Sequence, residues 1–254
     1  MRRSSILVFS LTIATVLSAQ PAMRVITEAD LSRVPDPVQR YLRYTKSVGK
    51  PFVTRVDLTQ SGKMKLKPDA DWIPLKAKQW YEVKETAFEW TGWVKAAPLF
   101  YVRAKDHYDN GVGSLKIHLW GFIPMGKAEG PEANQSELIR YLSEIIWFPS
   151  AMLQDNISWA ALDDTTARAT LSDDGLSVTG DFHIDPDGRF TAFTAQRYAD
   201  MGGGEYRLAD WYAPIYTYAE FNGWYLPSEG SAIWQYPEGD YEYIRLKIES
   251  ITLR

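Results

Sequence analysis

Apolar and polar residues alternate along much of this chain. In residues 75–84 the odd positions are mostly apolar and the even positions are mostly charged, and residues 115–123 alternate in the same way. A period of two residues predicts strands that bury one face. Further segments with strand-like composition bring the prediction to about eleven strands: 53–60, 88–96, 99–105, 167–172, 176–184, 190–198, 211–221, 224–235 and 241–253.

Short turn sequences separate many of these strands. Asn110-Gly111, Asp174-Gly175 and Asn222-Gly223 are pairs that favour tight hairpins, and Asp185 to Gly188 has the composition of a four-residue turn. Such short connections favour antiparallel neighbours over parallel crossover units.

Two segments show helical spacing instead. Val38, Tyr41 and Leu42 share one face of a helix that we expect near 28–46. A second apolar stripe predicts a helix near 136–148, with Ser136 as its N-cap and Pro149 as its end. The chain is therefore predicted to be mainly β with a few helices.

The distribution of aromatic residues predicts the shape of the sheet. The chain contains 10 Trp and 15 Tyr, and Trp80 and Trp120 fall on strand faces that are otherwise polar. A sheet that exposes one face to water does not need this pattern. We expect a strongly curved antiparallel sheet, an incomplete barrel, wrapped around or covered by helices. The alternative is that these aromatic residues cover sheet edges and helix flanks.

The first residues are typical of a secretory signal. Arg2 and Arg3 precede an apolar run from Ile6 to Ala19, which is shorter than the ~20 residues that span a bilayer. We expect residues 1–19 to be a cleaved signal peptide and residues 20–254 to be a single antiparallel β domain without a transmembrane helix, located in the periplasm or secreted. An uncleaved N-terminal anchor is the alternative.

Composition excludes several classes of function. The chain has no cysteine, so thiol catalysis, disulfides and thiolate metal sites are excluded. The formal net charge is −4, and loss of Arg2 and Arg3 makes it −6. An acidic chain without basic clusters is a poor candidate for binding nucleic acid or an anionic membrane surface.

No motif identifies a reaction. The three histidines, His107, His118 and His183, are far apart, and the sequence predicts no catalytic residue, metal site or cofactor. Carboxylates near the aromatic segment 211–225 leave a carboxylate-based hydrolase or a carbohydrate-binding protein as an alternative. These carboxylates are Glu205, Asp210 and Glu220.

The run from Arg140 to Pro149 reads R-Y-L-S-E-I-I-W-F-P. It resembles the helix signature R-Y-L-x-E-x-x-W-F-P of a prokaryotic family of unknown function. Further landmarks of that family occur in order along the chain: Arg40, Tyr41, Leu42, Gln60, Gly62, Trp72, Phe88, Trp90, Asp106, Tyr108, Gly111, Gly113, Trp159, Asp163, Arg197, Trp211, Gly223 and Pro227. The resemblance implies no known activity.

The order of elements is similar to that of the periplasmic lipoprotein-carrier (LolA-like) superfamily. A leading helix, a run of strands, a mid-chain helix and more strands occur in both. The resemblance implies a curved sheet that closes over helices and leaves an apolar groove for acyl chains, and hence lipid or lipoprotein handling. This is an analogy between folds.

We therefore expect an exported protein that binds a lipid or other amphipathic molecule, and favour this over an enzyme. An envelope structural or interaction module with a protein partner is a further alternative. The candidate ligand-binding residues are Arg140, Tyr141, Glu144, Trp147, Arg197 and Trp120. Arg140 and Glu144 could contact a polar headgroup at the mouth of the groove, or form an ion pair with a purely structural role.

Overall fold

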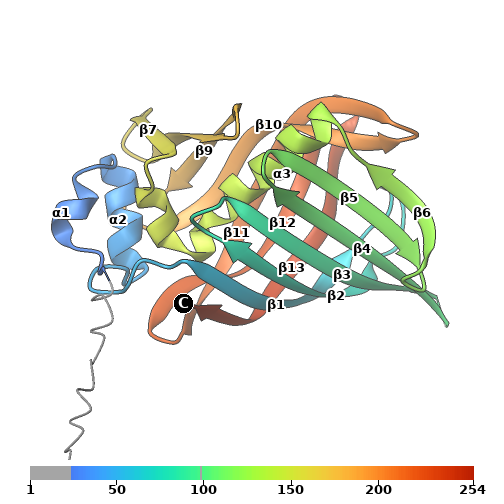
Figure 1. The fold of residues 1–254 in the computed structure, drawn as a ribbon, viewed down its shortest axis with the longest axis horizontal. Helices are drawn as coiled ribbons and strands as arrows, with labels where there is room; N and C mark the ends of the chain where they lie inside the picture. The colour runs from blue at the N-terminus through green and yellow to red at the C-terminus, as the bar shows by residue number, and fades with distance from the viewer. Residues whose placement is uncertain (1–23, 98) are drawn as a thin grey trace, which may run out of the picture.

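A computed structural model describes residues 24–97 and 99–254. The predicted signal segment, residues 1–19, lies outside the described residues. The described chain forms one antiparallel sheet of 13 strands that curls around a helix (Figure 1). The elements are α1 (Glu28–Leu31), α2 (Asp36–Tyr44), β1 (Arg55–Met64), β2 (Ile73–Glu82), β3 (Ala87–Ala97), β4 (Phe100–Asp109), β5 (Val112–Leu119), β6 (Ile123–Ala128), α3 (Pro131–Glu144), η1 (Ile145–Trp147), η2 (Pro149–Leu153), β7 (Ile157–Ala161), β8 (Thr166–Asp173), β9 (Leu176–Ile184), β10 (Phe190–Gly202), β11 (Glu205–Phe221), β12 (Trp224–Tyr236) and β13 (Gly239–Leu253).

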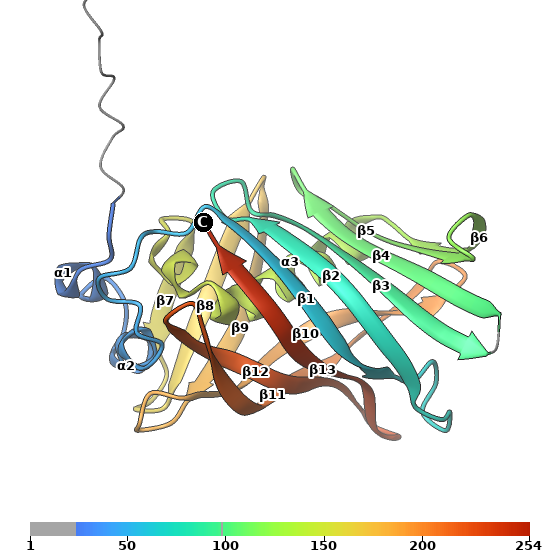
Figure 2. The same cartoon turned by 90° about the horizontal axis from the view of Figure 1, so that it is seen from below.

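The path of the chain explains why a helix lies inside the sheet. The strand order is β6-β5-β4-β3-β2-β1-β13-β12-β11-β10-β9-β8-β7, so the first and last strands pair in the middle. The chain runs outward from β1 to one edge at β6 and resumes at the opposite edge with β7. The segment that connects the two edges is α3 with the turns η1 and η2. It crosses the concave side, where it packs against β4, β5, β9 and β10 (Figures 1 and 2).

This architecture confirms the predicted fold, a mainly β chain with a strongly curved antiparallel sheet around helices. The apolar side of α3 enters the core, where Leu138, Tyr141 and Leu142 are fully buried. The ring of Phe148 lies 4.6 Å from that of Tyr81 and 5.7 Å from that of Tyr141, measured between centroids. Burying each such ring stabilises the fold by about 2 kcal/mol.

The predicted helix boundaries need correction. The helix expected near 28–46 is two helices, because Pro35 and Pro37 lack the N–H groups that a continuous helix would use. The second helix begins at Pro131 rather than at the predicted N-cap Ser136, whose hydroxyl instead donates to the carbonyl oxygen of Tyr198 at 2.9 Å.

The observed strands also differ from the predicted ones in two respects. The strand expected over 115–123 is broken by a turn at Trp120 and Gly121, both of which have positive φ. Neither edge strand was expected: β6 follows this turn, and the five residues of β7 show little alternation.

Helix α3 approaches the sheet closely at one glycine. A Cβ atom on Gly113 of β5 would lie 2.6 Å from the carbonyl oxygen of Ala133 and 2.9 Å from the Cβ of Glu137. The Gly113 N–H donates to Oδ1 of Asn134 at 2.8 Å. The first turns of α3 therefore rest directly on the backbone of β5.

We predict that Gly113→Ala lowers the free energy of unfolding by about 1–3 kcal/mol, because the added methyl group must push α3 away from β5. Gly126→Ala is the matched control, because a Cβ there would have its nearest neighbour at 4.0 Å. Urea unfolding of the two variants measures the difference. Equal stabilities would contradict the close approach.

Candidate functional site

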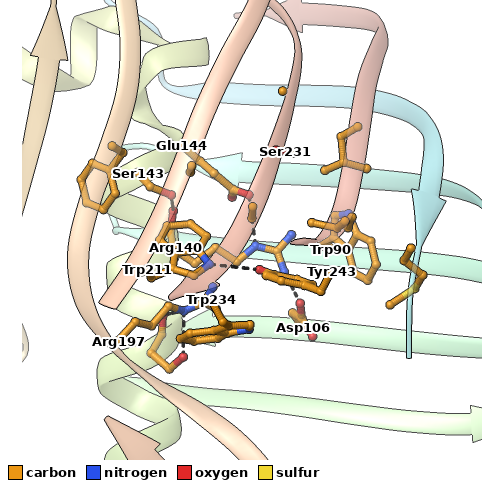
Figure 3. Close-up of a pocket in the computed structure, with 18 of the residues that line it drawn as sticks. Trp90, Asp106, Arg140, Ser143, Glu144, Arg197, Trp211, Ser231, Trp234 and Tyr243 are labelled. Carbon is orange, nitrogen blue, oxygen red and sulfur yellow. Dashed lines mark hydrogen bonds and ion pairs between the residues drawn. The ribbon is translucent and has the colours of Figure 1, made fainter. Parts of the chain in front are cut away.

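The concave side of the sheet holds a cavity of about 410 Å³ beside α3 (Figure 3). Most of its wall is apolar and comes from strands on both halves of the sheet, including Leu115, Ile117, Phe193, Ile215 and Ile248. The volume lies in the range of small-molecule binding sites.

One face of α3 forms the polar side of the cavity. The residues that line it repeat at intervals of three or four, which places them on one side of a helix. They are Ala133, Ser136, Glu137, Arg140, Ser143 and Glu144, followed by Trp147 in η1. The helix is thus amphipathic inside the protein, with its apolar side in the core and its charged side toward the cavity.

Arg140 is the centre of this polar side. Its guanidinium forms an ion pair with Asp106 of β4, and its Nε lies 3.1 Å from Oε1 of Glu144 (Figure 3). The charged carbon lies 5.3 Å from the ring centre of Phe88 and 5.1 Å from that of Trp90. Two carboxylates and two rings therefore hold the guanidinium in one place.

Hydrogen bonds connect Glu144 to the sheet. Its Oε2 accepts from Nε2 of Gln79 at 2.7 Å and from the hydroxyl of Tyr81 at 2.9 Å. Nearby, Nε1 of Trp90 donates to Oε1 of Gln60 at 2.8 Å. Because these groups are buried, each bond removes a desolvation penalty of about 1–3 kcal/mol.

Arg197 of β10 is the second cation. Its Nε donates to Oγ of Ser136 at 2.9 Å, and a terminal nitrogen lies 3.8 Å from Oε1 of Glu137. The guanidinium carbon lies 4.7 Å from the ring centre of Trp211 and 5.6 Å from that of Trp234. Arg197 is therefore held mainly by two indole faces and the first turns of α3.

These charges balance only if one carboxyl is protonated. Three acids, Asp106, Glu137 and Glu144, face two arginines, Arg140 and Arg197. Burial, and after it the charge of Asp106, raise the pKa of Glu137, Arg197 opposes both effects, and the net result is a pKa of about 8. Burial also raises the pKa of Asp106 against the pull of Arg140. The neutral form of Glu137 therefore dominates at pH 7.

For Arg140, the neighbouring charges have a larger effect on the pKa than burial has. Burial alone would lower its pKa, but the carboxylates of Glu144 and Asp106 outweigh that effect and raise it. Arg140 thus remains charged, and Glu137 is the member of the cluster that holds or releases a proton near neutral pH.

The structure brings together four of the six candidate residues. Arg140, Glu144, Trp147 and Arg197 all line the cavity. Tyr141 points to the other side of the helix, where its hydroxyl donates to the carbonyl oxygen of Val83 at 3.3 Å in the core.

Trp120 lies away from this group. It is 46% exposed in the turn between β5 and β6 and is not among the residues that line the cavity. The three carboxylates considered for a hydrolase also lie outside the cavity lining: Glu205, Asp210 and Glu220.

Sequence reasoning missed several members of the site. Asp106 and Glu137 place carboxyl groups in the cavity, and Trp90, Trp234 and Tyr243 form its walls. One signal was present for Asp106, which occupies the apolar face of a strand between Ala104 and Tyr108. A charged residue at an inward position of an alternating strand needs a partner, and the partner is Arg140.

The fold and site define a protein with a curved antiparallel sheet that encloses an apolar cavity around a buried ionic helix face. A family model described as a family of unknown function (DUF6544) matches residues 24–246, and the chain belongs to this family. The predicted membership in an uncharacterised family is therefore confirmed. No curated protein matches the chain.

The solved structures that align with this chain have low sequence identity to it. A domain named for outer membrane lipoprotein sorting, from Vibrio parahaemolyticus, aligns with a TM-score of 0.44 and 10% identity over 79% of this chain and 85% of its own. A LolA superfamily protein from Nitrosomonas europaea gives 0.41 and 10% over 85% and 93%. A DUF1329 family protein from Desulfovibrio piger gives 0.47 and 7% over 87% and 93%.

Among residues 24–97 and 99–254, no helix combines the length and the apolar character needed to cross a bilayer.

The pKa of Glu137 predicts a pH-dependent stability. The folded protein keeps this proton up to about pH 8, whereas the unfolded chain releases it near the ordinary value of 4.5. Rising pH therefore favours the unfolded chain between these values, and the contribution of Glu137 to stability is lost by about pH 8. We expect Glu137→Gln to remove this loss, so that the variant gains stability relative to wild type from pH 5 to pH 8.

Urea unfolding at several pH values measures this difference. Glu132→Gln is the control, because Glu132 lies on the same helix outside the cavity lining. A constant difference between wild type and Glu137→Gln across this range would show that Glu137 is ionised in the folded protein.

Proposed function

We propose that the protein binds an amphipathic small molecule, of which a lipid is the clearest example, in the cavity beside α3. The observation that carries the proposal is a cavity of about 410 Å³ with a mostly apolar wall and one ionic side. An apolar chain in this space would contact residues such as Leu115, Ile117 and Ile215. Each methylene group buried there would contribute about 0.8 kcal/mol.

The ionic side favours a particular kind of polar group. Arg140 pairs with Asp106 and Glu144, Arg197 lies beside Glu137, and the charges of the cluster as a whole balance when Glu137 is protonated. A ligand with a strong net charge would leave an uncompensated charge in a buried space. A neutral or zwitterionic polar group, held by hydrogen bonds and by the rings of Trp90 and Trp234, fits the site best.

We expect a substitution that fills part of the cavity to weaken ligand binding. Ala104 lines the cavity from β4, so Ala104→Phe should fill part of the space and weaken lipid binding by about tenfold or more. Thr91→Phe is the matched control, because Thr91 pairs with Lys105, the neighbour of Ala104 that alternates to the other face of the sheet.

The measurement begins with protein purified without detergent. Native mass spectrometry detects any bound ligand, and tryptophan fluorescence follows titration of the delipidated protein with zwitterionic and neutral lipids. Absence of both a co-purified apolar ligand and a titration response would refute the proposal. Equal binding by the two Phe variants would place the ligand elsewhere.

We also propose that the protein works in the periplasm or outside the cell, from the signal-like residues 1–19. The intact mass of the protein recovered from the envelope or medium should lack about 19 residues. Full-length protein confined to the cytoplasm would contradict export.

A further inference from the structure

Large apolar side chains gather at one end of the curved sheet. Three alternate turns, β1–β2, β3–β4 and β5–β6, lie at this end because the strands between them are antiparallel neighbours (Figure 2, right). They and the start of β6 carry exposed apolar residues that we call the apolar rim: Leu66, Leu99, Phe100, Trp120, Phe122 and Met125. Leu99 is 81% exposed, Phe122 is 71% and Met125 is 63%.

The backbone of the rim shows that these side chains are not ordinary turn residues. The two-residue turn before β5 contains Asn110-Gly111 and the three-residue turn after β5 contains Trp120-Gly121, and all four residues have positive φ. Asn is the usual residue in the first of these positions, because its short polar side chain tolerates this conformation. Leu99 also has a positive φ, of 67°.

Burial in the core does not explain why bulky apolar residues occupy these positions. A bulky residue with positive φ costs free energy, and an exposed apolar side chain regains little of it by burial. Trp120 stacks on Phe100 with 5.7 Å between ring centres, and its Nε1 donates to the carbonyl oxygen of Leu99 at 2.7 Å. The rim is thus an ordered apolar surface that faces outward.

The charge around the rim differs from that of the whole chain. The formal net charge of the protein is −4, but residues 90–105 and 112–128 contain no Asp or Glu, and the β1–β2 turn over residues 65–72 has two Lys and two Asp. The basic residues in these segments are Lys95, Arg103, Lys105, Lys116 and Lys127, of which Lys105 pairs with Glu89 at 2.7 Å and Lys127 with Glu129 at 2.8 Å. Apolar and aromatic tips flanked by basic side chains match the chemistry of an anionic lipid surface.

The rim is also continuous with the cavity. Leu66 belongs to the rim and lines the cavity, together with Met64 and Lys65 at the end of β1. A binding partner that covers the rim therefore lies next to the mouth of the cavity.

We propose that the apolar rim docks on the surface of an anionic lipid bilayer. Phe122, Trp120 and Met125 enter the interfacial layer, and Lys95, Lys116 and Arg103 contact anionic headgroups. This docking is independent of what the cavity binds, so the two proposals can fail separately.

The test uses flotation of the purified protein with vesicles of pure phosphatidylcholine or of phosphatidylcholine with 30% phosphatidylglycerol. We expect stronger binding to the anionic vesicles and weaker binding as salt is added. Phe122→Ser with Met125→Ser should weaken binding to both vesicles by about tenfold or more, because the apolar contact is lost. Val112→Ser with Leu162→Ser removes two exposed apolar residues outside the rim and should have no effect.

A second pair of variants tests the electrostatic contribution at exposed positions. Lys95→Gln with Lys116→Gln should weaken binding to the anionic vesicles and leave binding to pure phosphatidylcholine unchanged. Failure of the wild-type protein to bind either vesicle would overturn the proposal and leave a protein partner as the occupant of the rim. Equal binding by the wild type and the Phe122→Ser, Met125→Ser variant would also overturn it, whatever ligand the cavity holds.

Discussion

The structure depends on one constraint, which is that the chain must cross from one edge of the sheet to the other. Because β1 pairs with β13, the two halves of the sheet are joined by their first and last strands, and β6 and β7 end at opposite edges. The connecting helix crosses the concave side, and the sheet curls around it. A helix in that position is enclosed by protein on nearly all sides, so any polar residue on it needs a partner from the sheet.

The ionic cluster follows from this constraint. Arg140 and Glu137 lie on the side of α3 that does not pack into the apolar core, and the sheet supplies Asp106 and Arg197 opposite them. Because the charged groups have partners, the cluster can stay buried. A single unpaired charge in this position would lower the stability of the fold by several kcal/mol. The residues of the cluster also line the cavity, whose remaining wall is mostly apolar. The same residues thus serve the fold and shape the candidate site.

Much of the fold could be predicted from local patterns. Alternation in 75–84 and the turn signal at Asn222-Gly223 identify β2 and the β11–β12 hairpin, because both depend on neighbours in the sequence. The charge pairing could not be predicted in this way, since 34 residues separate Asp106 from Arg140 and 60 separate Glu137 from Arg197. Only pairs within the helix, Glu137 with Arg140 and Arg140 with Glu144, were visible from the spacing along the sequence.

Trp120 shows how an incorrect local assignment can still mark a residue of the proposed docking surface. Alternation placed it in a strand, on a face that it shared with Lys116 and His118. The structure instead places it in a turn with positive φ, where a tryptophan is unfavourable for the turn itself. A residue that neither the local conformation nor the core requires is best explained by something outside the fold. Net charge was equally misleading, because the −4 of the whole chain conceals two basic segments that border this residue. Local charge and local strain, taken together, therefore identify a surface that average composition excludes.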